Sequence, residues 1–339
     1  MTPRLSIVGL GMATPVGHDA VQTCAALRAG IGAFRQQEGI LDSRGRAVVA
    51  ATLPFEEPSA AERLLRAALS AVAEALAEAE PITGSTLYVA TVGPEAQRPG
   101  ISLDAVRLAD GTRRLAGPKR DVRFAHHPCG HAGGALALRQ IEAWLARDPG
   151  CLALLIGADS LCEAATLGYL DQAGRLKTPQ RARGLIPGEA AVALVVAAER
   201  AGPRAPVRSM ECPILGIGHS IEARRVVDET PCLGDGLTAA LRMAMGRIEW
   251  DAGAMGPTYC DLNGEDYRSN EWLLAACRTA VPDSLHHPAD CIGDVGAASF
   301  LLLLGLAAAD RRREGAEHAL VWASSDFGAR GAVCIGRLA

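Results

Sequence analysis

The sequence predicts an α/β protein built from two similar halves, and three observations support this fold class. Short apolar runs alternate with longer alanine-rich stretches that have helical periodicity. The apolar runs have few polar residues on either face, which is typical of strands in a sheet that helices cover on both sides. The order of helices and strands in the first half of the chain recurs in the second half.

The individual elements follow from these patterns. Strands are expected at 4–10, 85–92, 151–158, 190–197, 257–262, 318–325 and 331–338, and long helices at 59–80, 132–148, 234–248 and 296–313. In each half a long helix leads into a strand, a glycine-rich turn, a second long helix and a closing pair of strands. We therefore expect one half at 1–200 and the other at 201–339, divided near the glycine and prolines of 197–206.

Composition excludes several classes of function. The net charge is −4 and no basic block occurs, so the sequence does not indicate nucleic-acid binding. The first residues do not resemble a signal peptide, and no uncharged run is long enough to span a membrane. Ten scattered cysteines, mostly in apolar surroundings and without a CxxC pair, are typical of reduced, buried thiols. We expect a cytoplasmic protein without membrane contact.

The stretch HHPCGHAGG (126–134) is the main candidate for chemistry. Cys129 precedes a predicted helix, and a helix N-terminus lowers the pKa of a nearby thiol, which favours a nucleophile. The same stretch could instead form a tight turn, or could bind zinc together with HHPADC (286–291). The paired spacings of zinc sites are missing, however, so we expect no metal. GLGMATP (9–15) begins like a dinucleotide-binding loop, but Pro15 stands where the last glycine is needed.

Five segments, taken in order, resemble β-ketoacyl synthases. They are IVGLGMATPVG (7–17), the nucleophile region 126–160, the segment 174–201, IGDVGAAS (292–299) and SSDFGARGAVCIGRL (324–338). The resemblance implies the thiolase fold, with two βαβαβαββ halves related by a pseudo-two-fold axis and layered α/β/α/β/α. It also implies a homodimer that acts in fatty acid or polyketide biosynthesis. Its acyltransferase chemistry uses an acyl thioester on acyl carrier protein or coenzyme A and needs no cofactor.

The resemblance assigns roles to particular residues. Cys129 matches the acylated cysteine of the family. The oxyanion hole, which stabilises the charge of the tetrahedral intermediate, would use the N–H groups of Cys129 and Phe327. These positions imply that the chain handles acyl thioesters through Cys129.

The sequence departs from the family at the residues that support condensation. The two family histidines fall on Asn263, with Leu262 as the other candidate, and on Asp294, while Ala289 stands near the family lysine. An ionised aspartate can only accept hydrogen bonds and would repel a developing enolate. We therefore expect a divergent member with catalytic positions Cys129, Asn263 and Asp294 that does not carry out ordinary decarboxylative condensation. The alternative is a non-catalytic thiolase-fold partner or scaffold subunit, so enzyme activity stays open.

Two further features have alternative interpretations. His131, His127 or His126 could assist Cys129 in place of the missing histidines, or could be polar residues that cap the loop or helix. The acidic segment 261–272 would place carboxylates at the edge of the family's pocket. It could equally be a polar loop that ends in a helix cap at Ser269.

Overall fold

A computed structural model of the 339-residue chain provides the fold. It describes residues 3–79, 86–100, 103–199, 211–228, 230–246, 255–279, 281, 284–314 and 318–336. The predicted division between residues 200 and 201 lies outside these ranges. No helix among the described residues is long and apolar enough to cross a bilayer.

The N-terminal half forms a mixed sheet of five strands. In chain order they are β1 (Leu5–Ala13), β4 (Thr86–Val92), β5 (Asp121–His127), β6 (Leu152–Ser160) and β7 (Glu189–Ala198). Their order across the sheet is β5-β4-β6-β7-β1. β4 is parallel to β5 and β6, whereas β7 is antiparallel to β6 and β1.

The C-terminal half repeats this arrangement. Its strands are β8 (Cys212–Ile221), β9 (Met255–Cys260), β10 (Leu285–His286), β11 (His318–Ser324) and β12 (Ala329–Gly336). They follow the equivalent order β10-β9-β11-β12-β8, with the same parallel and antiparallel neighbours. The prediction of two similar halves is therefore confirmed. Leu5–Ile7 of β1 pairs with Cys212–Ile214 of β8 and joins the two halves by hydrogen bonds.

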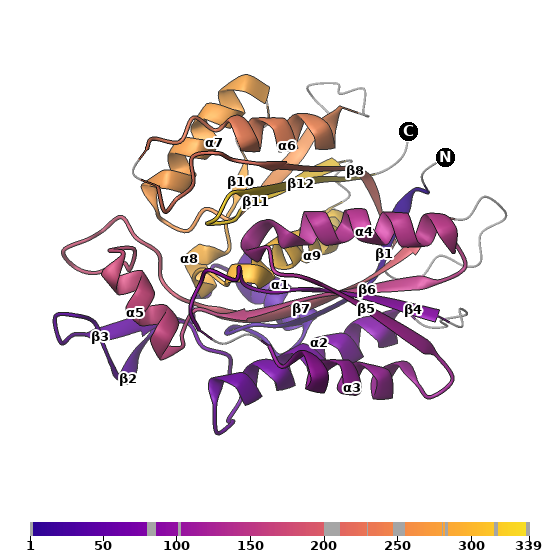
Figure 1. The fold of residues 1–339 in the computed structure, drawn as a ribbon, viewed down its shortest axis with the longest axis horizontal. Coiled ribbons are helices and arrows are strands. Elements are labelled where there is room, and N and C mark those ends of the chain that lie inside the picture. The colour runs from indigo at the N-terminus through magenta and orange to yellow at the C-terminus, as the bar shows by residue number, and fades with distance from the viewer. Residues whose placement is uncertain are drawn as a thin grey trace.

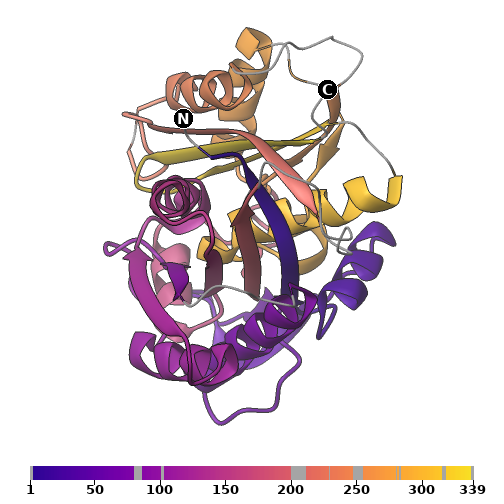
Figure 2. The same cartoon turned by 90° about the vertical axis from the view of Figure 1, so that its right-hand side faces the viewer.

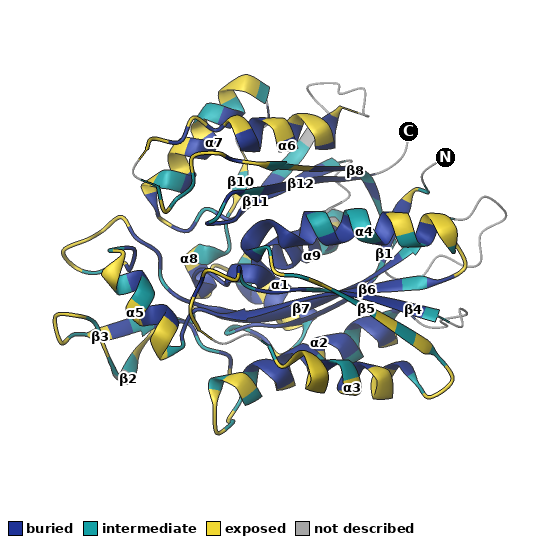
Figure 3. Cartoon of the chain, viewed as in Figure 1, coloured by how far each residue is buried: buried dark blue, intermediate teal, exposed yellow. Residues whose placement is uncertain are grey.

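The two halves stack as five layers (Figures 1 and 2). Helices α4 (Gly133–Arg147) and α9 (Ser299–Glu314) lie between the sheets, where most of their residues are buried (Figure 3). α2 (Ala60–Glu78) and α3 (Ala105–Ala116) cover the outer face of the N-terminal sheet. α6 (Asp235–Met245) and α7 (Asp266–Thr279) cover the outer face of the C-terminal sheet. The predicted α/β/α/β/α layering is thus confirmed.

Small residues allow helix α2 to pack closely on strand β1. A Cβ atom on Gly9 or Gly11 would lie only 2.3 or 2.0 Å from a carbonyl oxygen of α2. The glycines of GLGMATP therefore lie inside a strand and serve packing, and they do not form a phosphate-binding loop. Helix α2 begins after Ser59, whose hydroxyl accepts the Glu62 N–H at 3.2 Å.

Several elements were not predicted from the sequence. They are α1 (Ala20–Arg28), β2 (Arg35–Leu41), β3 (Ala47–Ala50), α3, β5, α5 (Ala164–Gln172), β8, β10 and α8 (Ala289–Ile292). α7 was expected only as one alternative, as a helix that begins after Ser269. β5 is an edge strand with alternating exposed residues, and β8 contains Pro213 and two glycines. The expected burial of the cysteines holds for most of them, but Cys277, on α7, is exposed.

Candidate functional site

Cys129 lies in a tight turn between β5 and α4. The Gly93 N–H donates to the His127 carbonyl at 3.1 Å, and the Gly130 N–H donates to the Gly93 carbonyl at 3.0 Å. Gly130 has a φ of 62°, a left-handed conformation that favours glycine. The half-buried cysteine is therefore held against the loop that follows β4.

The expected lowering of the Cys129 pKa is wrong. Burial and the nearby carboxylate of Glu95 raise the pKa of this thiol. A short 3-10 turn, Gly130–Ala132, separates the cysteine from α4, which begins only at Gly133. The favourable effect of a helix N-terminus fades within one turn, so α4 gives the thiolate little help.

Glu95 is a buried carboxylate that packs directly over the turn that contains Cys129. A Cβ atom on Gly130 would lie 2.1 to 2.3 Å from the Glu95 carboxyl group. The same carboxyl accepts the Asp326 N–H at 3.1 Å. Burial and the charge of Asp326 raise the pKa of Glu95. Glu95 thus bridges the cysteine turn and the loop 325–328.

The two predicted oxyanion-hole donors differ in their surroundings. The Cys129 N–H donates to the His127 carbonyl at 2.9 Å and is already engaged. The Phe327 N–H is not used by any hydrogen bond found among the described residues. The hydroxyl of Ser325 donates to the Cys129 carbonyl at 2.5 Å and accepts the Ala132 N–H at 2.8 Å. This hydroxyl therefore links the loop 325–328 to the turn that contains Cys129.

Asn263, Asp294 and His131 meet in one hydrogen-bonded group, although they come from different segments. The Nε2 atom of His131 lies 2.6 Å from one Asp294 oxygen, and the Asn263 amide donates to the other at 2.7 Å. Burial alone would lower the pKa of His131 and raise that of Asp294. Their mutual attraction outweighs burial, so the pKa of His131 is raised and that of Asp294 is lowered. The buried pair therefore favours a protonated His131 beside an ionised Asp294.

The other two histidines are not part of this group. The Nδ1 atom of His126 lies 2.9 Å from the Thr91 hydroxyl on the neighbouring strand. The Nε2 atom of His127 is buried without a hydrogen-bond partner among the described residues. Burial lowers the pKa of both histidines. They are neutral residues of β5 and do not supply a positive charge that would activate the thiol.

A larger network of buried charges surrounds the Asn263–Asp294 pair. We call it the buried charge network, and its members are Glu95, Arg175, Asp261, Glu265, Arg268, Asp294, Asp326 and His131. Arg175 binds Glu265 through two contacts of 2.7 Å and Asp326 through contacts of 2.6 and 3.1 Å. Arg268 binds Asp261 at 2.6 Å and Asp326 at 3.1 Å. Arg175 and Arg268 thus cross-link carboxylates from two chain segments, the acidic segment 261–272 and the loop 325–328.

The acidic segment 261–272 is therefore neither an exposed polar loop nor an open pocket edge. Asp261 and Glu265 are buried in the network, whereas Asp266 is exposed. α7 already begins at Asp266, so the expected helix cap at Ser269 is wrong, and its hydroxyl donates to the Glu265 carbonyl at 3.2 Å inside the helix.

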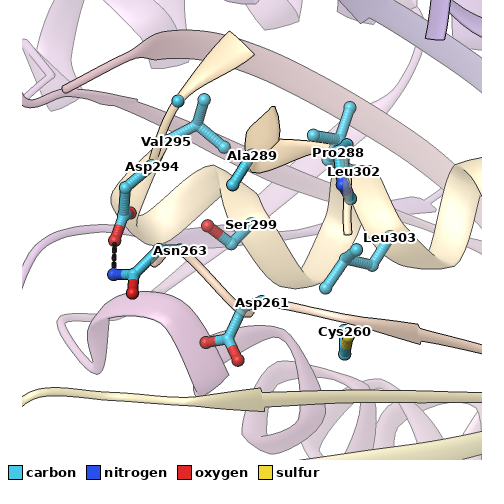
Figure 4. Close-up of a pocket in the computed structure, with 11 residues that line it drawn as sticks. Cys260, Asp261, Asn263, Pro288, Ala289, Asp294, Val295, Ser299, Leu302 and Leu303 are labelled. Carbon is cyan, nitrogen blue, oxygen red and sulfur yellow. Dashed lines mark hydrogen bonds between the residues drawn. The ribbon is translucent and has the colours of Figure 1, made fainter. Parts of the chain in front are cut away.

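Space beside the Asn263–Asp294 pair is limited. Figure 4 shows a cavity lined by these two residues together with Asp261, Ser299 and neighbouring apolar side chains. Its volume is about 20 Å³, which is enough for about one water molecule. The arrangement can hold charges and hydrogen bonds in fixed positions, but this cavity cannot hold an acyl chain.

The sequence analysis did not single out Glu95, Arg175, Arg268 or Asp326. Glu95 carried one usable signal, because it lies shortly after β4, and side chains that follow neighbouring parallel strands gather at one edge of a sheet. The arginines carried none, since their partners are up to 151 residues away in the sequence.

Comparison with known proteins addresses the fold. No protein-family model matches the sequence, and no curated protein matches it. Among solved structures, a β-ketoacyl synthase from Burkholderia phymatum STM815 is 18% identical with a TM-score of 0.79, covering 99% of this chain and 100% of that one. The ishigamide ketosynthase/chain length factor is 17% identical with a TM-score of 0.78, covering 100% of both.

A third similar structure is a type II polyketide synthase acyl-carrier protein in complex with its ketosynthase, AntDE:AntF. It is 13% identical with a TM-score of 0.79, and the match covers 100% of both chains. Because the sequence identities are only 18%, 17% and 13%, these comparisons establish the fold alone. The chain has the thiolase-type fold of β-ketoacyl synthases over its whole length, as the sequence resemblance implied.

Proposed function

We propose that this ketosynthase-like chain is a non-condensing subunit in fatty acid or polyketide synthesis, and that it pairs with another thiolase-fold chain. One observation carries the proposal. The positions that the resemblance assigns to two condensation histidines hold Asn263 and Asp294, which are hydrogen-bonded to each other, and Asp294 is also paired with His131. A carboxylate whose pKa is lowered remains negative and can donate no hydrogen bond to an enolate.

The expected effect on condensation is large. Loss of one oxyanion donor lowers a rate by about 10²–10³-fold, and this site lacks a donor at Asp294. The Asn263 amide nitrogen already donates to Glu265 at 3.0 Å and to Asp294, so its donor capacity is also engaged. The raised pKa of Cys129 and the position of Glu95 further oppose formation of an acyl-enzyme.

The edge of the N-terminal sheet supports pairing with another chain. β5 is the outermost strand, so one side of its backbone lacks a neighbouring strand among the described residues. Such an edge is a template for pairing with a strand of another subunit. A homodimer would satisfy this edge by two-fold symmetry, and a related ketosynthase chain would satisfy it in a heterodimer.

Two measurements test the proposal. The purified protein is incubated with acyl and malonyl thioesters of an acyl carrier protein, beside an active ketosynthase as positive control. We expect no 3-ketoacyl product, and robust product formation would overturn the proposal. Native mass spectrometry, alone and after co-expression with a ketosynthase chain, should show a dimer; a monomer in both cases would exclude pairing.

Acyl transfer through Cys129 without condensation is the second candidate. It is favoured by the partial exposure of this thiol and by the Phe327 N–H, which is free of other acceptors in the described structure. The thiol would attack the thioester carbonyl, release the carrier thiol and retain the acyl group as a new thioester. Intact-protein mass spectrometry after exposure to acyl thioesters, with Cys129→Ala as control, separates the candidates. A Cys129-dependent adduct favours acyl transfer, and no adduct favours the non-catalytic subunit.

A further inference from the structure

A second group of chemically active side chains lies away from Cys129. Glu222 directly follows β8, Cys232 lies in the segment before α6, and Glu271 projects from α7. All three are buried, with exposed fractions of 3%, 8% and 0%. One potential ligand atom from each residue lies within 4.8 Å of the other two. The group therefore brings two carboxylates and a thiol from three elements into one small volume.

An unpartnered buried atom suggests that a ligand is needed here. The Oε1 atom of Glu271 accepts from the Arg330 guanidinium at 2.5 Å and from the Cys232 thiol at 3.7 Å, whereas the Oε2 atom is buried without a hydrogen-bond partner among the described residues. Buried carboxylate oxygens normally have a partner, and an orphan calls for an explanation such as an ion. The residue is fully buried, so bulk water does not supply that partner.

The charges in the group are also unbalanced. Glu222 and Glu271 supply two negative charges, and Arg330, which is 0% exposed, supplies one positive charge. One carboxylate, Glu222, is therefore left without a cation of its own and is held only by backbone N–H groups. A divalent cation that displaces the thiol proton of Cys232 would bring the total to zero.

The other contacts suit metal ligands. Glu222 is oriented by the N–H groups of Arg224 at 3.1 Å and Gly236 at 2.8 Å. The Sγ atom of Cys232 accepts the Gly234 N–H at 3.3 Å, a contact that would stabilise a thiolate. Outer contacts of this kind hold ligands in position at protein metal sites.

We propose that Glu222, Cys232 and Glu271 bind one zinc ion. Zinc can bind both cysteine sulfur and carboxylate oxygen, whereas calcium and magnesium prefer oxygen ligands alone. On binding, the Cys232 S–H bond breaks, its proton passes to solvent, and a zinc–sulfur bond forms without any redox change. This site could not be predicted from the sequence, because the ligands are widely spaced and follow no paired motif.

The site connects to the loop beside Cys129. Arg330, which binds Glu271, also donates to the carbonyls of Ser325 at 2.8 Å and Ala329 at 3.0 Å. Zinc bound at Glu271 would thereby help to fix the loop that contacts the cysteine turn. This role is structural and does not depend on the proposed function.

The test uses the whole chain after treatment with a chelator. Elemental analysis and titration calorimetry with zinc should show one zinc ion bound per chain. Bound zinc should also raise the melting temperature of the chain. Cobalt in place of zinc should give the thiolate-to-cobalt charge-transfer absorption of a tetrahedral site. Cys232→Ser should abolish this absorption and weaken zinc binding more than 100-fold, beyond the ~10–100-fold typical of outer contacts. The control Cys277→Ser, at an exposed cysteine on α7, should change neither the cobalt absorption nor the zinc affinity.

Three results would overturn the proposal: no zinc uptake, zinc binding that survives Cys232→Ser, or a cobalt spectrum without a thiolate band. If Cys232→Ser fails to fold, Glu222→Gln provides a second variant with the same expected loss of zinc. Peptide mapping of wild-type protein in mild denaturant needs no variant. Zinc should slow alkylation of Cys232 but not of Cys277, and equal rates with and without zinc would contradict the site.

Discussion

Replacing Arg175 with methionine tests whether the buried charge network stabilises the fold. Arg175 is 8% exposed and holds Glu265 and Asp326 at 2.6 to 3.1 Å. Its removal leaves two buried carboxylates without their main partner, and loss of one member of a buried ion pair costs about 3–5 kcal/mol. We expect the free energy of unfolding to fall by this amount.

The expected change in melting temperature follows from the size of the chain. With 339 residues and about 2.1 cal/mol/K per residue, the unfolding entropy is about 0.7 kcal/mol/K. Arg175→Met should therefore lower the melting temperature by about 4–7 °C in calorimetry. Arg175→Lys keeps the charge but loses the paired contacts, so it should fall between wild type and Arg175→Met.

Arg183 provides a matched control. It forms a 3.2 Å ion pair with Asp266, but the two side chains are 78% and 58% exposed. Pairs of this kind contribute about 0–1 kcal/mol, so Arg183→Met should shift the melting temperature by less than about 1.5 °C. Equal shifts for Arg175→Met and Arg183→Met would refute the reasoning. Adding Glu265→Gln to Arg175→Met should recover part of the loss, because it removes one uncompensated charge.

Three further predictions follow from the site and the packing. Glu95→Gln should speed alkylation of Cys129 several-fold in mass-spectrometric assays, because it removes a negative charge beside the thiol. An unchanged alkylation rate would show that Glu95 does not affect the reactivity of this cysteine. The raised pKa of His131 stabilises the fold fully below about pH 6.5, the ordinary histidine value, and this contribution is lost as pH rises through the folded value. His131→Gln should therefore flatten the denaturant-measured stability profile above that pH, and a profile parallel to wild type would contradict the ion pair. Gly11→Ala should lower the free energy of unfolding by about 1–3 kcal/mol, because its Cβ atom would lie 2.0 Å from a carbonyl oxygen of α2. Gly168→Ala, which has open space around it, should leave this free energy unchanged. Equal melting temperatures for the two variants would argue against close packing at Gly11.

The fold was predictable because its main elements carry strong local patterns. The strands at 152–160 and 189–198 are almost wholly apolar, and they were expected within a few residues of their observed bounds. β5 was missed because an edge strand alternates exposed and half-buried residues, so it lacks a continuous apolar run. The sequence therefore revealed the covered interior of the sheet better than its edge.

The candidate site was only partly predictable. The resemblance pointed to Cys129, Asn263 and Asp294, and the structure shows that the last two are hydrogen-bonded to each other. No local pattern could reveal that Arg175 and Glu265 pair, because 90 residues separate them and only the fold brings them together. The raised pKa of Cys129 was also hidden, since it depends on burial in the folded chain and on the carboxylate of Glu95, which follows a different strand.

The buried charge network should respond to heat differently from the apolar core around it. Removing charged groups from water becomes less unfavourable as temperature rises, whereas the stabilisation per unit of buried apolar surface levels off. The pairs formed by Arg175 and Arg268 should thus contribute relatively more to stability near the melting temperature than at room temperature. These buried ion pairs would then help the centre of the molecule to resist thermal opening.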